Sequence, residues 1–170
     1  MMVSEASGTL PVYTMGRPRC QQRFHSAEIS FPVRLPVDRG GTMAETTDHE
    51  GIARVVARYC HLLDDGRWDE FAGLWADDAE FVLQGQATKG RAAIRDAIAA
   101  TQPPERRGRH LAVNLEIDVD GDRATNVCDF MFWARNPEGR AALMFLGRYD
   151  DTLVRTADGW QFARREITFF

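Results

Sequence analysis

A carboxylate and an imidazole, Asp64 and His110, are the side chains of this chain best placed for general acid–base chemistry. A carboxylate that binds one ring nitrogen of a histidine fixes the tautomer of the ring, and the other nitrogen can then take a proton from a substrate. Asp64 lies at the end of an amphipathic segment, whereas His110 opens a long stretch of alternating apolar residues. The two residues form a catalytic pair only if the chain between them folds both side chains into one pocket.

The segment before Asp64 has the spacing of an amphipathic helix. Thr47 or Asp48 is the expected N-cap, and Gly66 suits the C′ position after the last turn. Apolar side chains recur between these ends at helical spacing, namely Ile52, Val55, Val56, Tyr59, Leu62 and Leu63.

The inward face of this helix would end in Asp64. Cys60 and Asp64 are four residues apart, so they share a face with Val56, and Tyr59 lies beside them. A carboxylate turned toward the interior costs free energy unless it has a hydrogen-bonding partner. His110 is the candidate partner.

The residues before His110 predict three further elements and the breaks that separate them. In chain order, these elements are a helix over residues 68–75, a short strand around Phe81 and Leu83, and a third helix over about residues 90–100. A break over residues 76–78 ends the second helix, and Pro103 and Pro104 end the third.

From His110 onward the apolar residues alternate with a period of two, which is typical of half-buried strands. Strands are expected over residues 110–119, 123–134, 140–156 and 160–169, with turns at Asp120-Gly121 and at residues 157–159. Helices followed by antiparallel strands indicate an α+β fold. A strongly curved sheet that wraps the three helices would enclose a cavity.

Several short segments resemble one known group of proteins. They are YCHLLDDGRW at 59–68, LWADDAEF at 74–81, KGR at 89–91, HLAVN at 110–114, VDGDRA at 119–124, GRYDD at 147–151 and DGWQFARR at 158–165. Together they resemble the SnoaL-like group of the nuclear-transport-factor-like superfamily, over roughly residues 48–168. The resemblance implies a cone-shaped α+β barrel, a scaffold that carries many chemistries.

The resemblance also implies roles for individual residues. Scytalone dehydratase, hexachlorocyclohexane dehydrochlorinase and bile-acid 7α-dehydratase pair an Asp at the end of the first helix with a His at the start of the long strands, and Asp64 and His110 match these positions. By the same resemblance, Tyr59 would polarise a carbonyl or steady a leaving hydroxyl. Arg165 would stabilise an enolate or an anionic leaving group. These four are the predicted catalytic residues.

Six further residues are predicted to bind the substrate. Cys60 and Phe81 match pocket residues of the dehydrochlorinase, which has a Trp at the position of Phe81. Asn114 lies four residues after His110 in the same expected strand, so the two side chains should share a face, and Asn114 would add a polar contact. The remaining three are aromatic residues of the long strands, Phe130, Phe132 and Phe145. A cavity lined in this way favours a small hydrophobic ligand.

Each candidate also has a purely structural interpretation. Asp64 would cap the helix or face solvent, and His110 would lie at an exposed strand edge. Tyr59, Cys60 and the strand aromatics would pack in the core. Arg165 would pair with Glu166 or Asp151 at the surface.

The candidate side chains suit proton abstraction followed by loss of water or halide, and they equally suit a proton-shuttling isomerisation. The predicted function is therefore that of a cofactor-independent lyase of the dehydratase type. An isomerase or polyketide-cyclase-like enzyme of the same fold is the first alternative. The second is a ligand-binding or subunit module without chemistry, as in the β subunits of ring-hydroxylating dioxygenases.

Composition and residue spacing indicate which kinds of partner and cofactor the chain is expected to bind. A net charge of −4 argues against nucleic acid, and no apolar run approaches the roughly 20 residues of a membrane helix. Three widely spaced cysteines predict free thiols in the reducing cytoplasm, and the four histidines lack metal-ligand spacing, so neither metal nor cofactor is expected. Related folds associate through their sheets, so a homodimer or a homotrimer is expected.

Residues 1–42 differ in composition from residues 43–170. They carry five Arg and three acidic residues, whereas the remainder carries 16 basic and 22 acidic residues. The first segment is rich in Gly and Pro without any sustained period, which predicts a disordered extension. Met43 directly precedes the patterned domain, and we expect it to be the true start.

Overall fold

The computed structural model describes residues 43–170, with their side chains from Thr47 onward, and the extension predicted over residues 1–42 lies outside the described residues. The elements in chain order are α1 (Met43–Asp65), α2 (Trp68–Ala72), β1 (Trp75–Leu83), β2 (Gln86–Lys89), α3 (Arg91–Thr101), the 3₁₀ helix η1 (Pro104–Arg106), β3 (Arg109–Asp120), β4 (Arg123–Arg135), β5 (Ala141–Thr156) and β6 (Gly159–Phe169).

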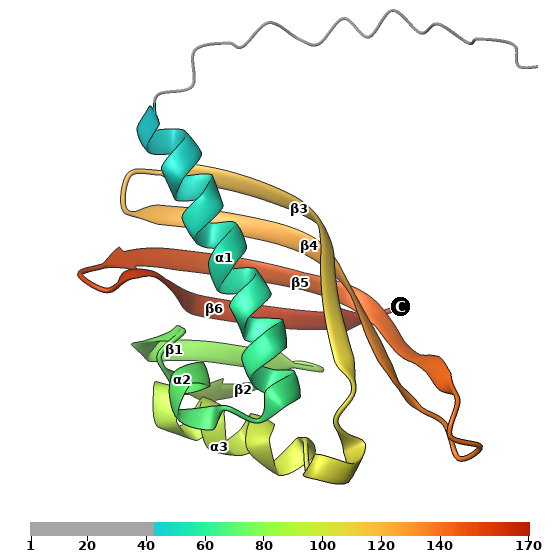
Figure 1. Cartoon of the computed structure of the whole chain (residues 1–170). Coiled ribbons are helices and arrows are strands. Elements are labelled where there is room, and N and C mark those ends of the chain that lie inside the picture. Colours follow the sequence, from blue (N-terminus) through green and yellow to red (C-terminus); the bar gives the residue numbers. More distant parts are fainter. Residues whose placement is uncertain (1–42) are drawn as a thin grey trace, which may run out of the picture. The chain divides into compact units, whose positions relative to one another are not determined.

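The strands form one six-stranded sheet in the order β2-β1-β6-β5-β4-β3. Strands β3 to β6 follow one another as antiparallel neighbours, and β1 joins β6 in parallel. Figure 1 shows the sheet curving around α1, with α2 and α3 near β1 and β2. The predicted α+β fold with a curved, mostly antiparallel sheet is confirmed.

The core lies between α1 and the concave face of the sheet. The helix contributes Ile52, Val56 and Tyr59, and the sheet contributes Leu153 and Phe162 among other buried residues. Alternate residues along β4 and β5 are buried, as the period of two predicts. No helix in the described part of the chain is both long and apolar enough to cross a membrane.

Two sequence predictions about the first elements are wrong. The first helix begins at Met43, so neither Thr47 nor Asp48 is its N-cap, and the Asp48 carboxylate instead binds Arg155 and Trp160. Residues 76–78 are not the break that ends the second helix but lie inside β1. The register of β1 shifts between Trp75 and Glu80, and two acidic side chains in this stretch are exposed.

The end of α1 and the limits of the four long strands agree closely with the pattern. Gly66 follows α1 with a φ of 68°, the left-handed conformation that glycine adopts without strain. The second helix is shorter than predicted and ends at Ala72, and the long strands begin and end within about a residue of their expected limits. The pattern does not predict β2, which pairs with β1 through a turn that contains Gln84 and Gly85, both at positive φ.

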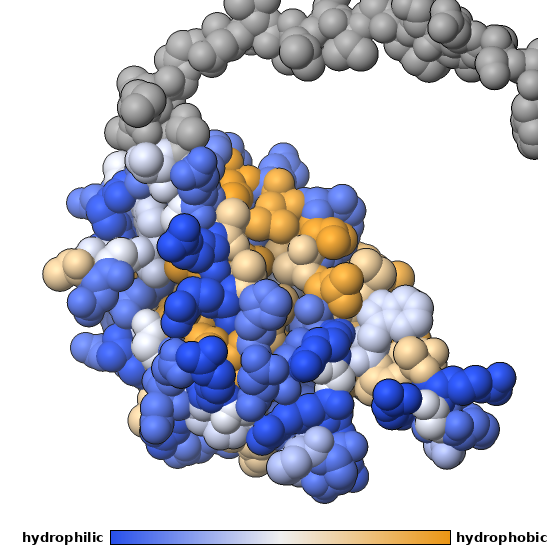
Figure 2. Space-filling view, viewed as in Figure 1, coloured by the Kyte–Doolittle hydropathy of each residue, from blue (hydrophilic) through white to orange (hydrophobic). Residues whose placement is uncertain are grey.

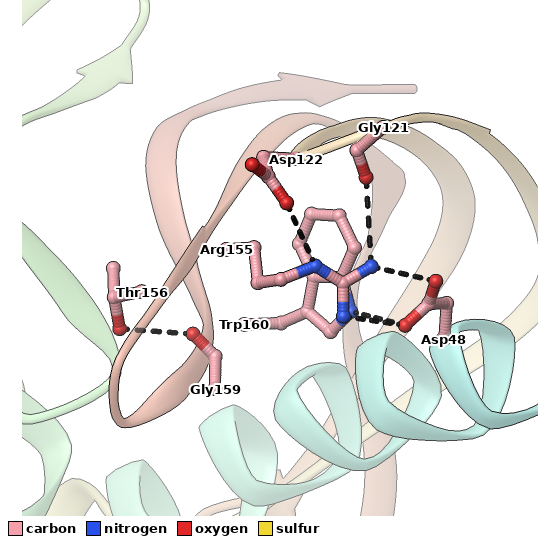
Figure 3. Close-up of polar contacts among 7 residues, drawn as sticks. All are labelled: Asp48, Gly121, Asp122, Arg155, Thr156, Gly159 and Trp160. Carbon is pink, nitrogen blue, oxygen red and sulfur yellow. Dashed lines mark hydrogen bonds and ion pairs between the residues drawn. The ribbon is translucent and has the colours of Figure 1, made fainter. Parts of the chain in front are cut away.

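A polar cluster around Arg155 connects the first turns of α1 to the turns that join β3 to β4 and β5 to β6 (Figure 3). The Arg155 guanidinium donates two hydrogen bonds to Asp48, at 2.7 and 2.6 Å, and one to Asp122 at 3.1 Å. It also lies over the Trp160 ring, 4.5 Å from the centroid, and Trp160 donates to the Asp48 carboxylate at 3.3 Å. The cluster therefore joins α1, the β3–β4 turn and the β5–β6 hairpin.

Substitution of Asp48 should loosen this connection in a pH-dependent way. The hydrogen bonds from Arg155 hold the pKa of Asp48 below its ordinary value of 3.8, so the ionised carboxylate stabilises the fold above that pH and the stabilisation is lost as pH falls through the lowered pKa. We expect Asp48→Asn to lower the Tm at pH 7 and the deficit to disappear in acid, as measured by thermal unfolding from pH 2 to pH 7.

Asp158→Asn is the matched control, since Asp158 is an exposed carboxylate of the β5–β6 turn without a partner among residues 47–170. Equal Tm losses for the two variants, or a loss for Asp48→Asn that does not change with pH, would contradict the assignment.

Candidate active site

The last turn of α1 and the first residues of β3 meet at Asp64 and His110. Asp64 Oδ1 lies 2.6 Å from His110 Nδ1, and Asp64 Oδ2 accepts the backbone N–H of His110 at 2.8 Å. The side chain of Asp64 is 3% exposed and that of His110 is 10% exposed. One carboxylate therefore holds both the backbone and the ring of the histidine.

This geometry determines which ring nitrogen is available for chemistry. An ionised carboxylate can only accept hydrogen bonds, so the contact with Asp64 places the hydrogen on Nδ1 of His110. In the neutral ring Nε2 is then the acceptor. The His110 ring also packs against Phe132, with the ring centroids 4.4 Å apart, so its orientation is restricted on two sides.

His110 lines a pocket of about 470 Å³ on the concave side of the sheet. Its apolar lining includes Phe81, Phe130, Phe132 and Phe145, all four predicted from the sequence to bind the substrate. Its other lining residues are Leu83, Gln84, Gln86, Thr88, Ala97, Ile98, Thr101, Gln102, Tyr149, Ile167 and Phe169. The pocket has the size and the mostly apolar surface of a small-molecule site.

Asn114 does not line the pocket, and the expectation that it shares a face with His110 is wrong. The pairing of β3 with β4 shifts between Val113 and Glu116, and Asn114 itself adopts a φ of 56°. This bulge turns the side chain away, and its amide donates to Asp129 at 3.0 Å. The alternation of side chains between the two faces of a strand does not continue across such a bulge, so it cannot be used to place Asn114.

Arg165 is buried within the sheet and not at the surface. Its guanidinium donates to both oxygens of Asp151, at 2.7 and 2.8 Å, and neither side chain is exposed. Asn126 donates to the same carboxylate at 2.7 Å. The three residues are direct cross-strand neighbours on β4, β5 and β6, so the strand register brings them together.

Aromatic rings complete the surroundings of Arg165. Its guanidinium carbon lies 4.1 Å from the centroid of Tyr59, 4.0 Å from Tyr149 and 4.2 Å from Phe162. Burial acts to lower the pKa of Arg165, but the charge of Asp151 outweighs it and holds that pKa above its ordinary value. Arg165 is therefore a charged residue of the core, with its charge balanced by Asp151.

Tyr59 and Cys60 also belong to the core, and neither lines the pocket. Tyr59 packs against Phe71 and Trp75, and burial raises its pKa to about 12. Burial likewise raises the pKa of the Cys60 thiol to about 12, so it is not a nucleophile near neutral pH. The structure therefore brings Asp64 and His110 together but leaves Tyr59 and Arg165 outside the pocket.

A wider cleft of about 1120 Å³ adjoins the pocket. Thr101, Gln102, Phe132 and Phe145 line both cavities, so the pocket opens toward the cleft. Thr101 and Gln102 are not evident from the sequence, because a polar residue at the end of a helix has the same local pattern whether it lines a site or faces solvent. Among residues 47–170, no three His, Cys, Asp or Glu side chains gather in a way that suits a metal ion.

The model of the SnoaL-like domain family matches residues 44–166, and the chain belongs to this family. An uncharacterized Mycobacterium tuberculosis protein, Rv2910c, is 28% identical over 133 residues, which cover 75% of this chain and 88% of the relative.

Two solved structures extend the likeness. A variant of Rv3472, a Mycobacterium tuberculosis protein of unknown function, has a TM-score of 0.71 and 28% identity, covering 78% of each chain. A Novosphingobium aromaticivorans protein assigned as a scytalone dehydratase has a TM-score of 0.66 and 25% identity, covering 74% of this chain and 86% of that one. Both structures share the fold of this chain over the residues that are covered.

Substitution of Arg165 should show whether its role is structural. Arg165→Met leaves the Asp151 carboxylate buried without its ion partner, which should lower the free energy of unfolding by about 3–5 kcal/mol. The double variant Arg165→Met/Asp151→Leu removes both charges and should recover part of that loss. Urea unfolding of the variants measures both effects.

Arg164→Met is the neighbouring control, because Arg164 pairs with Glu80 and Glu166 near the surface, where such a pair contributes about 0.2–1 kcal/mol. A loss in Arg165→Met no larger than in Arg164→Met would exclude the structural role.

Proposed function

We propose that this protein is a cofactor-independent lyase of the dehydratase type, in which Asp64 orients His110 as the general base. The observation that carries the proposal is the double contact between the two residues, combined with the position of the His110 ring in the wall of an apolar pocket. A buried carboxylate and imidazole arranged in this way are costly in a purely structural module.

The proposed reaction needs only these two side chains. Nε2 of His110 takes a proton from a carbon next to a carbonyl of the substrate, and the C–H electron pair forms the new double bond as the C–O bond to a neighbouring hydroxyl breaks. The imidazolium returns its proton to the departing hydroxide, so water leaves and the histidine is neutral again. Asp64 stabilises the transient charge on the ring.

The pocket supports a small hydrophobic substrate. Phe81, Phe130, Phe132 and Phe145 supply flat apolar surfaces, while Thr101 and Gln102 supply polar groups at one end. Likeness to the protein assigned as a scytalone dehydratase supports the same reaction class. A bicyclic β-hydroxy ketone, whose dehydration gives a conjugated or aromatic product, is the substrate class that fits best.

Removal of the base should abolish turnover without unfolding the protein. For a bicyclic β-hydroxy ketone of the 3-hydroxy-1-tetralone type, we expect His110→Gln to lower kcat by about 10²- to 10⁴-fold. Asp64→Asn should have a similar effect, because an amide can donate to Nδ1 and so move the ring hydrogen to Nε2. Ultraviolet absorbance and a mass loss of one water measure the product.

Asp65→Asn is the matched control, since this neighbouring carboxylate is half-exposed and pairs with Arg109. Full activity in His110→Gln would refute the proposal. A product of unchanged mass that still requires His110 would identify the isomerase alternative with the same base.

We also propose that the chain associates with a second copy of itself through the outer face of the sheet. Leu111, Met131 and Leu146 are cross-strand neighbours on β3, β4 and β5, and Trp133 pairs with Leu143 beside them. Four of the five are exposed, Leu111, Trp133, Leu143 and Leu146, at 39–45% of their surface. A contiguous apolar patch of this kind is typical of a subunit interface.

The variant Leu143→Glu/Leu146→Glu places two charges in this patch and should convert an oligomer to a monomer. Light scattering coupled to size-exclusion chromatography measures the mass. Thr125→Glu, an exposed position near the other end of β4, is the control and should keep the wild-type mass. A monomeric wild-type protein would exclude self-association.

A further inference from the structure

Four arginines line the cleft next to the pocket, and three of them, Arg106, Arg107 and Arg135, have no acidic partner, whereas Arg109 pairs with Asp65. The lining also holds two carboxylates, Glu105 and Asp64, and Asp64 is bound to His110. Arg106 and Arg107 come from η1 and the residue that follows it, and Arg135 comes from the end of β4. Arg140 lies on the same β4–β5 hairpin, next to the lining residue Ala141. Figure 2 shows strongly hydrophilic side chains on the hairpin and on the part of the domain that faces it, with a gap between them.

These arginines differ from most others in the domain. Within residues 47–170, six arginines have no carboxylate within ion-pair distance, namely Arg54, Arg106, Arg107, Arg123, Arg135 and Arg140. Three of the six, Arg106, Arg107 and Arg135, line this cleft, and Arg140 belongs to the same β4–β5 hairpin as Arg135. The clustering is notable because residues 43–170 carry more acidic than basic side chains.

The cations are also free to meet a ligand. Arg106 and Arg140 are exposed, and no side-chain bond of either is formed within residues 47–170. Arg135 donates only to the backbone oxygen of Gly139, at 2.7 Å. Arg107 is less available, because it donates to Gln102 and lies near the Trp68 ring. The unpaired arginines of the lining outnumber its one carboxylate without an ion partner, Glu105, and an excess of positive charge around a cleft favours an anionic ligand.

The floor of the cleft leads from these cations to the proposed base. Phe132 and Phe145 line both the cleft and the pocket, and Phe132 also packs against the His110 ring. Met144 adds apolar surface to the cleft. One ligand can therefore place an apolar part beside His110 and extend along the aromatic floor toward the arginines.

We infer that the substrate is amphipathic: its reacting part is apolar, and an anionic end group, a carboxylate or a phosphate, binds Arg106, Arg135 and Arg140 at the mouth of the cleft. Guanidinium groups bind both anions through paired N–H donors. The inference rests on the proposed function for the reacting end of the ligand, whereas the anion site stands on the charge distribution alone.

Binding of three matched probes tests the inference without turnover. The probes are 4-(2-naphthyl)butanoate, 4-(2-naphthyl)butyl phosphate and the neutral 4-(2-naphthyl)butan-1-ol, titrated by calorimetry at two salt concentrations. We expect at least one anion to bind tighter than the alcohol, with a preference that falls as salt rises. Preference for the carboxylate or for the phosphate identifies the end group.

The variants Arg106→Gln, Arg135→Gln and Arg140→Gln should each weaken anion binding by about twofold to fivefold, and the triple variant should abolish the preference, while binding of the alcohol is unchanged. Arg123→Gln is the control, since Arg123 is equally unpaired but lies at the opposite end of β4. Equal affinity of the wild type for all three probes, or an unchanged preference in the triple variant, would overturn the inference.

This test separates the anion site from the proposed chemistry. Loss of anion preference in the arginine variants supports the site even where His110→Gln retains activity. Conversely, an inactive His110→Gln protein with no anion preference in the wild type leaves the lyase proposal intact and refutes only the amphipathic substrate.

Discussion

The buried ion pair between Arg165 and Asp151 is the interaction on which the rest of the domain depends. A guanidinium without exposed surface remains charged in a core only where a carboxylate and aromatic faces replace water. The pair forms only when β5 and β6 are in the observed register, with Asn126 of β4 aligned beside them. A slip of one residue would turn these side chains to the outer face. The pair therefore selects the register of three long strands at once.

The same interaction reaches the candidate base through α1. Tyr59 covers the Arg165 guanidinium, and Asp64 follows it on the same helix, opposite the first residues of β3. At the other end, Asp48 binds Arg155. Helix α1 is thus held at its start, its middle and its end, and His110 receives its carboxylate from a rigid element. A base supported in this way needs no rearrangement of a loop to become oriented.

The fold was predictable wherever a local signal decided the structure. Gly66 ends a helix and Asp120-Gly121 makes a hairpin for reasons contained in a few residues. The role of Asp48 was not predictable, since its partner Arg155 is 107 residues away on β5. The acidic residues at 77 and 78 resembled a break, but they lie on the exposed side of a strand with an irregular register. Only the tertiary pairing determines such positions.

The difference between local signals and tertiary pairing also decides which residues of the site could be predicted. Periodicity and the family resemblance predicted Asp64, His110 and the pocket phenylalanines. Asp151 was also one of the two partners expected for Arg165, but at the surface, and the burial of the pair depends on how three strands align. The pairing of Arg165 with Asp151 also affects where an anionic ligand can bind. Because Asp151 already balances the buried guanidinium, Arg165 has no uncompensated charge to offer an anion. Three of the arginines without carboxylate partners, Arg106, Arg107 and Arg135, line the cleft and come from η1 and the β4–β5 hairpin. Recognition of a negatively charged group is therefore expected at the mouth of the site, and the interior is left for apolar contacts and proton transfer.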